Sequence, residues 1–338
     1  MPFNPGRVMF EAAALEYPRG RELYQYFKNQ PVEFSVIGSH NRVTGIPART
    51  PQQGFMEAKR TLVFGVRRTL RFETCKPSAH YQLPLATGCP GRCQYCYLLT
   101  SMPQKPYLRA YVNVEEILDK AGEYIKQRLP EVTVFEGAAT SDPVPVERYT
   151  GALGLAIEFF ARQEQGRFRF VTKFTEVEPL LGLEHRRHTR IRFSLNTDSV
   201  IGRFEGGTPR LTERIATARS TAAAGYPLGF IIAPIIAYPG WEEEYTGMLE
   251  DLKASLGDAP DLTFELISHR FTTRAKNRIQ ELFPNSGLPL ETEDREYKYG
   301  QFGYGKYLYP REERERIREI LADGINRRFP LARVEYSI

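Results

Sequence analysis

Short apolar segments alternate with amphipathic segments between residues 81 and 282. The apolar segments have the length of buried strands, and they are residues 81–86, 131–135, 168–174, 190–195, 227–236 and 262–267. The intervening segments have helical periodicity, and they are residues 114–129, 151–162, 177–185, 212–224, 245–256 and 273–282. This alternation predicts an α/β core of parallel strand–helix units. A partly closed barrel and an open doubly wound sheet both fit, and both collect functional groups at the carboxyl ends of their strands.

The segments outside this alternation have a different character. Residues 1–79 are rich in Arg, Pro and Gly. They indicate an irregular N-terminal extension that packs on the core, with a helix near residues 21–28 and a strand near residues 61–66. The end of the chain predicts a tyrosine-rich β-hairpin and then a basic helix over residues 311–328. We therefore expect one compact unit with three segments, residues 1–79, 80–283 and 284–338.

Composition narrows the class of protein. The chain has 338 residues and a formal net charge of +5, which permits a nucleic-acid partner without establishing one. It has no apolar run of about eighteen residues that would predict a membrane span, and its start lacks the order of a signal peptide. Only four cysteines are present, which fits a reduced, cytoplasmic setting better than a disulfide framework.

Three of the four cysteines lie in the stretch ATGCPGRCQYCYLLT. Cys89, Cys93 and Cys96 have the spacing Cys-x3-Cys-x2-Cys and follow the first predicted core strand. Three thiolates on one loop can hold three irons of a [4Fe–4S] cluster, which leaves the fourth iron open to a small molecule. The Gly-Cys-Pro-Gly run supplies tight turns that let the sulfurs converge.

A structural zinc site is the alternative for this loop. Zinc requires four protein ligands in such sites, and Cys75 or His80 would have to complete the set. A zinc-stabilised nucleic-acid-binding module is therefore the non-enzyme interpretation. A zinc protein would be colourless, whereas a cubane cluster gives a brown protein.

The cysteine spacing, its place after the first strand and the aromatic Tyr95 before the last cysteine resemble the radical S-adenosylmethionine (SAM) enzymes. The resemblance implies a partial (β/α)6 barrel, a [4Fe–4S] cluster and SAM as cofactors. In that superfamily SAM is cleaved reductively to methionine and a 5′-deoxyadenosyl radical.

A closer resemblance, to the spore photoproduct lyases, covers nearly the whole chain. It is carried by TGCPGRCQYCYL, FEGAATSDPVPVE, RFSLNTDS, IIAPIIAYPGWEEEY, SHRFTTRAKNRIQELFP and YKYGQFGYGKYLYP. It implies a DNA repair lyase that returns 5-thyminyl-5,6-dihydrothymine to two thymines, starting with removal of hydrogen from C6. The implied partners are ultraviolet-damaged double-stranded DNA with the lesion flipped out and an electron donor such as flavodoxin or ferredoxin. The implied setting is a monomer in the spore cytoplasm.

One position departs from that family. Ala139 stands where the family has a hydrogen-donating cysteine. A methyl C–H bond is much stronger than a thiol S–H bond, so we expect the chain to start the radical reaction and to finish it poorly. An engineered substitution is one explanation, and a natural variant with another donor is the other. Cys75 does not match the family position and is expected to be a small buried apolar residue.

The resemblance and the strand-end rule together give the cofactor candidates. Tyr95 and Tyr97 flank Cys96, and the family implies that they relay hydrogen between the thiol and SAM; otherwise they pack the loop. The expected cofactor-binding residues are Tyr97, Ser141, Lys173, Ser194, Asn196 and Ala233, where SAM offers a carboxylate, ribose hydroxyls and an adenine edge. Ser141 could equally contact the lesion or cap a helix.

The lesion candidates lie after the last predicted core strand and in the hairpin. They are Ser141, Arg270, Tyr304, Lys306 and Tyr307. Basic side chains suit phosphates, and aromatic side chains suit a wedge or a stacked base. The enzyme must extrude the joined bases to reach C6. A radical SAM enzyme acting on RNA or on a protein is the alternative that iron content alone would not exclude.

Overall fold

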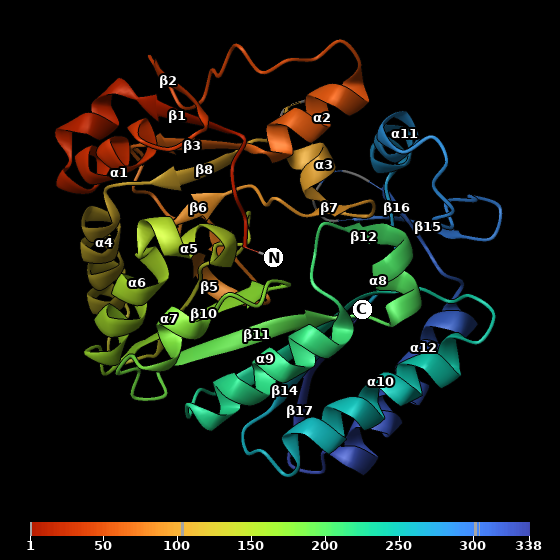
Figure 1. Cartoon of the computed structure of the whole chain (residues 1–338). Helices are drawn as coiled ribbons and strands as arrows, with labels where there is room; N and C mark the ends of the chain where they lie inside the picture. Colours follow the sequence, from red (N-terminus) through yellow and green to blue (C-terminus); the bar gives the residue numbers. More distant parts are fainter. Residues whose placement is uncertain (1, 103–104, 301–302, 304) are drawn as a thin grey trace. The chain divides into compact units, whose positions relative to one another are not determined.

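The computed structural model describes residues 2–102, 105–300, 303 and 305–338. The chain divides into two compact units. Figure 1 shows its helices and strands, coloured along the sequence. Unit 1 contains Met1–Pro90 and Met102–Arg190, and unit 2 contains Gly91–Ser101 and Ile191–Ile338. The three segments expected from the sequence, 1–79, 80–283 and 284–338, stay a prediction. No helix among the described residues is long and apolar enough to cross a membrane.

The N-terminal part of unit 1 forms a five-stranded sheet, so the prediction of an irregular extension is wrong. Its order is β2-β1-β3-β8-β6, with all pairs parallel except β6 with β8. The strands are β1 (Arg7–Glu11), β2 (Glu33–Ile37), β3 (Thr61–Gly65), β6 (Ala86–Thr87) and β8 (Leu108–Tyr111). Its helices are α1 (Pro18–Lys28), which the sequence predicted, and α2 (Pro51–Lys59), together with a short 3-10 helix, η1 (Ala12–Glu16).

The sheet forms because its central strands are apolar on both faces. Every residue of β1 and β3 is buried, which suits a parallel strand covered on two sides. Phe10 of β1 and Phe64 of β3 stack with their ring centroids 4.9 Å apart. Strand β3 confirms the strand expected near residues 61–66. The two strands are only five residues long and stand far apart in the chain, so local periodicity did not identify the sheet as a whole.

The second part of unit 1 continues the expected alternation. Parallel strands β5, β9 and β10 lie side by side, with β4 antiparallel at the edge. These strands are β4 (Thr74–Cys75), β5 (Ala79–Gln82), β9 (Thr133–Glu136) and β10 (Gly166–Thr172). The helices are α4 (Val114–Gln127), α5 (Val144–Thr150), α6 (Ala152–Ala161) and α7 (Glu178–Leu181).

The strand predicted over residues 81–86 is two separate strands. Pro84 lacks the amide hydrogen that a continuous ladder needs, so β5 ends before it and β6 begins after it, in different sheets. The helix predicted over residues 177–185 is the single turn α7. Helix α5 was not predicted.

Unit 2 holds the parallel strand order β11-β13-β14-β17. Its longer elements are β11 (Thr189–Leu195), α8 (Asp198–Phe204), α9 (Leu211–Ala223), β13 (Leu228–Ile235), α10 (Trp241–Leu256), β14 (Thr263–Ser268), α11 (Thr273–Leu282), α12 (Arg311–Arg328) and β17 (Arg333–Ser337). Helix α10 packs between α9 and α12 (Figure 1). Strand β17 was not predicted, because its sequence RVEYS is short and mostly polar.

Unit 2 also has short elements, which include part of the cysteine loop and the hairpin. They are β7 (Arg92–Cys93), α3 (Leu98–Ser101), β12 (Glu205–Gly206), β15 (Glu296–Tyr299) and β16 (Gly305–Leu308). Strands β15 and β16 pair antiparallel, which confirms the predicted hairpin, and α12 confirms the predicted basic helix.

Candidate active site

The cysteine loop begins directly after β6, at a glycine that the backbone requires. Gly88 has a φ of +88°, and a Cβ there would lie 2.7 Å from the carbonyl oxygen of Tyr107. Its amide donates to the carbonyl of Thr140 at 2.9 Å, and its carbonyl accepts from the amide of Asp142 at 3.2 Å. The loop that contains Cys89 is therefore bonded to the loop that follows β9.

Position 139 lies on that second loop. The turn 137–140 follows β9, and Ala139 is half-buried within it. Its neighbour Thr140 is the residue whose carbonyl accepts from Gly88, which in turn precedes Cys89. The structure thus brings the expected hydrogen-donor position and the first cluster cysteine onto adjoining loops of unit 1.

Cys93 and Cys96 belong to unit 2. Cys93 is buried in β7, which pairs antiparallel with β12 in the register Cys93–Glu205. The amide of Cys96 donates to the carbonyl of Cys93 at 3.3 Å, a tight turn before α3. None of the four cysteines forms a disulfide.

The donor set of this loop fits a [4Fe–4S] cluster. Three thiols within eight residues are the ligands that iron–sulfur cubanes take. Among the described residues the three thiols are not gathered in a metal-binding arrangement, so the fit rests on the donor chemistry and the spacing of the loop. The buried ammonium of Lys59, at the end of α2, donates to the carbonyl of Cys89 at 2.8 Å, which places a positive charge beside the loop.

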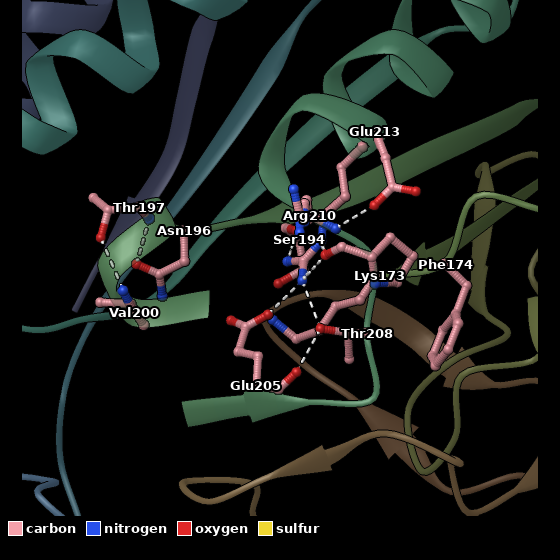
Figure 2. Close-up of polar contacts among 12 residues, drawn as sticks. Lys173, Phe174, Ser194, Asn196, Thr197, Val200, Glu205, Thr208, Arg210 and Glu213 are labelled. Atoms are coloured by element: carbon pink, nitrogen blue, oxygen red, sulfur yellow. Dashed lines mark hydrogen bonds and ion pairs between the residues drawn. The ribbon is translucent and has the colours of Figure 1, made fainter. Parts of the chain in front are cut away.

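Tyr95 is fixed by a buried ion pair. Its phenol donates to the carboxylate of Glu205, and Arg214 binds the other oxygen of that carboxylate at 2.6 Å. Arg214 also donates to the carbonyl of Ser194 at 3.0 Å and to Thr208 at 2.8 Å. Figure 2 shows Glu205, Thr208 and Ser194 in this network.

This network keeps the Tyr95 phenol protonated. Removal of the phenol from water raises its pKa well above the usual value, and the negative charge of Glu205 raises it further. Tyr97, two residues on, is 56% exposed. The two tyrosines around Cys96 therefore stand in different surroundings.

Asp142 joins the strand-end candidates of unit 1. Its carboxylate accepts from the hydroxyl of Thr172 at 2.8 Å and from the amide of Lys173 at 2.9 Å. Burial raises the pKa of Asp142 to about 6, against the opposing effect of these hydrogen bonds. Lys173 follows β10 as expected, and Ser141 is buried, with its hydroxyl 3.5 Å from the carbonyl of Gly137.

Asn196 is the most constrained candidate of unit 2. Its amide donates to the carbonyl of Pro234 at 2.8 Å, and its oxygen accepts from the amide of Thr197 at 3.1 Å and the phenol of Tyr245 at 2.7 Å. Figure 2 shows Asn196 beside Thr197. An asparagine side chain has two donor hydrogens and two acceptor lone pairs. These contacts use both lone pairs and one amide hydrogen of this fully buried residue, and the described residues leave the other amide hydrogen unused.

The other two candidates flank Asn196. Ser194 is buried near the end of β11, and Ala233 lies half-buried on the adjacent strand β13. The strand-end rule therefore collects Ser194, Asn196 and Ala233 at neighbouring strands of unit 2, as the sequence predicted.

Three of the lesion candidates, Arg270, Lys306 and Tyr307, lie in or next to the hairpin. Phe271 and Tyr307 exchange backbone hydrogen bonds of 3.1 and 2.8 Å, and their rings stack at 5.4 Å. Arg270 precedes this bridge, and its charge, together with burial as the larger effect, lowers the pKa of Lys306. Tyr304 lies outside the described residues.

Three residues of this region escaped the sequence analysis. Lys59, Glu205 and Arg214 lie in no motif, and each acts through a contact with a residue distant in the chain. The expectation for Cys75 was also wrong in part, because it lies half-buried on the edge strand β4 rather than in the core. No local sequence signal separates these residues from other charged or small positions.

Comparisons with known proteins agree over the whole chain. The family model described as spore photoproduct lyase matches residues 3–338. The spore photoproduct lyase of Clostridium acetobutylicum is 51% identical over 334 residues, 98% of each chain. That of Bacillus subtilis (strain 168) is 50% identical over 337 residues, 99% of this chain and 98% of the relative.

Solved structures of spore photoproduct lyase align equally well. One, complexed with dinucleoside spore photoproduct, has a TM-score of 0.97 at 46% identity and covers 100% of both chains. Another has a TM-score of 0.97 at 47% identity, again covering 100% of both chains; it is a mutant with one cysteine changed to alanine and one serine changed to cysteine, with bound AdoMet and the dinucleoside. These matches confirm the predicted α/β fold class of the radical SAM type. The chain belongs to the spore photoproduct lyase family.

Proposed function

We propose that Cys89, Cys93 and Cys96 hold the [4Fe–4S] cluster with which this radical SAM lyase returns spore photoproduct in DNA to two thymines. Membership of the family makes the chain a DNA repair lyase that uses the cluster and SAM. The observation that carries the site assignment is the Cys-x3-Cys-x2-Cys loop, bonded through Gly88 to the loop of position 139. When bound, the cluster and SAM supply the 5′-deoxyadenosyl radical that removes hydrogen from C6 of the lesion.

The strand-end residues are proposed to bind SAM. The Lys173 ammonium suits the SAM carboxylate, and the remaining amide hydrogen of Asn196 and the hydroxyl of Ser194 suit the ribose. Backbone groups at Ala233 suit the adenine edge. Ser141 is proposed to contact either SAM or the lesion, since it lies beside the loop of position 139.

Tyr95 and Tyr97 are proposed to relay hydrogen, in line with their places around Cys96. The bond to Glu205 fixes the orientation of the Tyr95 phenol, and its raised pKa keeps the transferable hydrogen in place. The exposure of Tyr97 leaves it accessible to SAM and to the lesion. Arg270, Lys306 and Tyr307, with Tyr304, are proposed to bind the damaged DNA.

Ala139 is proposed to impair the final step. The product radical must recover one hydrogen atom, and the methyl group at position 139 donates hydrogen far less readily than a thiol. Cys75 is the one thiol of the chain outside the cluster motif. A slow return of hydrogen would let the product radical react with other partners.

The substrate, the oligomeric state, the electron donor and the cellular location complete the proposed function. A DNA lesion is the substrate, and the form we propose is double-stranded DNA with the lesion flipped out. We propose a monomer in the spore cytoplasm, reduced by a flavodoxin or a ferredoxin. The origin of the relatives in spore-forming bacteria supports this setting.

Anaerobic reconstitution with iron and sulfide tests the assignment of the cluster. We expect a brown protein that, with SAM and a strong reductant, consumes the lesion in an oligonucleotide. Cys93→Ala should lose the cluster and the activity, whereas the matched control Cys75→Ala should keep full iron content. A Cys93→Ala protein with a full cluster would contradict the ligand assignment.

Product analysis tests the role of position 139. Ala139→Cys should raise the fraction of consumed lesion recovered as thymine, at similar rates of lesion loss. Cys75→Ala in the parent background should leave the thymine fraction low. A parent protein that already converts the lesion to thymine quantitatively would contradict the proposed impairment. If the thymine yield of such a parent fell in Cys75→Ala, Cys75 would be the hydrogen donor.

A further inference from the structure

Lys59 ends helix α2 with its charge directed at the cysteine loop. Its side chain is only 4% exposed, and its ammonium donates to the carbonyl of Cys89 at 2.8 Å. The ring of Phe55, one helical turn earlier, lies 5.4 Å from the ammonium. Both partners belong to unit 1, so the contact is internal to one compact unit.

Lys59 has no carboxylate partner among the described residues, unlike the other buried basic side chains. Among the described residues, five lysine and arginine side chains are buried, and the other four each lie within 4.0 Å of a carboxylate. These four are Arg7, Arg169, Arg192 and Arg214. No carboxylate of a described residue lies within that distance of Lys59, and the nearby Glu57 pairs with Arg7 at 3.6 Å. A buried cation without an anion is costly, so an anion is expected beside it.

The cysteine loop supplies that anion once the cluster is present. Three thiolates on a [4Fe–4S] cubane give a net negative charge, and reduction makes it more negative. Charges near a cluster and hydrogen bonds around it set its reduction potential. A fixed positive charge stabilises the reduced state more than the oxidised state.

We propose that Lys59 is the counter-cation of the cluster, positioning the Cys89 loop and raising the reduction potential so that the cluster accepts an electron more readily. This inference rests on the proposed cluster site at Cys89. Lys59 is a positioning residue in this account, because it acts through the loop and through its charge and touches no reacting atom.

A redox titration of the reconstituted protein tests the proposal. Lys59→Met should lower the midpoint potential, so that about tenfold less reduced cluster forms at a fixed applied potential, or about 59 mV for a one-electron couple. Lys59→Arg keeps the charge and should keep the potential near that of the parent. The reduced cluster is counted by electron paramagnetic resonance, and iron is measured in each protein.

The matched control is Lys105→Met. Lys105 also donates its ammonium to a backbone carbonyl in unit 1, that of Ile46 at 2.9 Å, but not to the cysteine loop. It should leave the potential unchanged. Equal potentials for the parent and Lys59→Met at full iron content would overturn the proposal, as would equal shifts in Lys59→Met and Lys105→Met.

If Lys59→Met does not assemble the cluster, no potential can be measured for it, and the iron content of the variants tests the proposal instead. Lys59→Gln is then the second charge-removing variant. Iron lost from both neutral variants and kept by Lys59→Arg supports the proposal, whereas iron lost from all three overturns it, because charge is then not the requirement. A parent protein that holds no cluster under any condition contradicts the proposed function itself rather than the role of Lys59.

Discussion

Gly88 joins the loop that carries Cys89, a proposed cluster ligand, to the loop that carries position 139. Its positive φ and the 2.7 Å approach to the Tyr107 carbonyl leave no room for a side chain. Gly88→Ala should therefore lower the free energy of unfolding by about 1–3 kcal/mol and reduce iron uptake on reconstitution. Urea unfolding and iron analysis measure the two effects.

Gly247→Ala is the control for this substitution. Gly247 lies inside α10 with no atom within 4 Å of the added Cβ, so alanine should raise stability by about 0.5–1 kcal/mol through helix propensity. Iron uptake should not change. If Gly88→Ala takes up iron and unfolds like the parent, the strained glycine does not hold the cysteine loop.

The Tyr95→Phe and Tyr97→Phe variants should differ in their free energy of unfolding, even if both return hydrogen to the product radical more slowly. Tyr95→Phe removes a donor from the buried Glu205 carboxylate and should cost about 1–3 kcal/mol of unfolding free energy. Tyr97→Phe changes an exposed side chain and should stay within about 0.5 kcal/mol of the parent. Both should lower the thymine yield per lesion consumed.

The thymine yields of these two variants test whether the tyrosines relay hydrogen. They are best measured in the Ala139→Cys background, where a thiol can start the hydrogen return. Unchanged thymine yields in both phenylalanine variants would leave the tyrosines with packing roles alone.

At the scale of elements, Asp142 ties the loop after β9 to the end of β10. Its folded pKa of about 6 lies above the ordinary 3.8, so the protonated carboxyl suits the folded state better than the carboxylate does. This contribution to stability is complete below about pH 4 and is lost as the pH rises through about 6. Relative to Asp142→Asn, the parent should lose up to ~3 kcal/mol over that window.

Unfolding free energies of the two proteins at several pH values between 4 and 7 measure this effect. Burial also raises the pKa of Glu147 to about 7, which gives a parallel pH dependence in both proteins. The difference between parent and variant therefore isolates Asp142. A difference that does not change with pH would contradict the assignment.

The hairpin carries a like-charged pair that suits a nucleic-acid backbone. Lys298 and Lys306 are direct partners in the β15–β16 register, so both side chains lie on one face of the hairpin. Like charges opposite one another destabilise a sheet unless an anion lies between them. The tyrosine pair Tyr297–Tyr307 lies on the other face, with ring centroids 5.1 Å apart.

Replacing both lysines by alanine should weaken binding of DNA with and without the lesion to the same extent. The slope of log K against log salt should fall by about 2, one for each phosphate contact. Fluorescence titrations at several salt concentrations measure the slope, and Lys253→Ala, on helix α10, is the control. An unchanged slope would remove the hairpin face from the DNA contacts.

At the scale of the molecule, the local sequence pattern predicted the long helices and the long apolar strand. Helix α12 begins and ends at the predicted residues, and β13 and α9 differ by a residue at each end. Apart from β3, the strands of the N-terminal sheet and β17 were not predicted in this way, because these short strands exist through pairing with distant partners. Predicting the sheet required knowing which segments meet.

The same distinction between local and distant features applies to the candidate site. The cysteine spacing, the strand-end residues and the hairpin were visible in the sequence, since each is local. The roles of Lys59 and Glu205 were not, because Lys59 meets Cys89 across 30 residues and Glu205 meets Tyr95 across 110 residues. Charge partners in a folded core leave no local signal.

The most direct test of the lyase assignment is to follow the hydrogen at C6 of the lesion. An oligonucleotide with spore photoproduct deuterated at C6 is turned over anaerobically with the reconstituted protein, SAM and a strong reductant. We expect mass spectrometry to detect deuterium in the recovered 5′-deoxyadenosine or SAM. Lesion loss with no deuterium in either compound would contradict the lyase assignment.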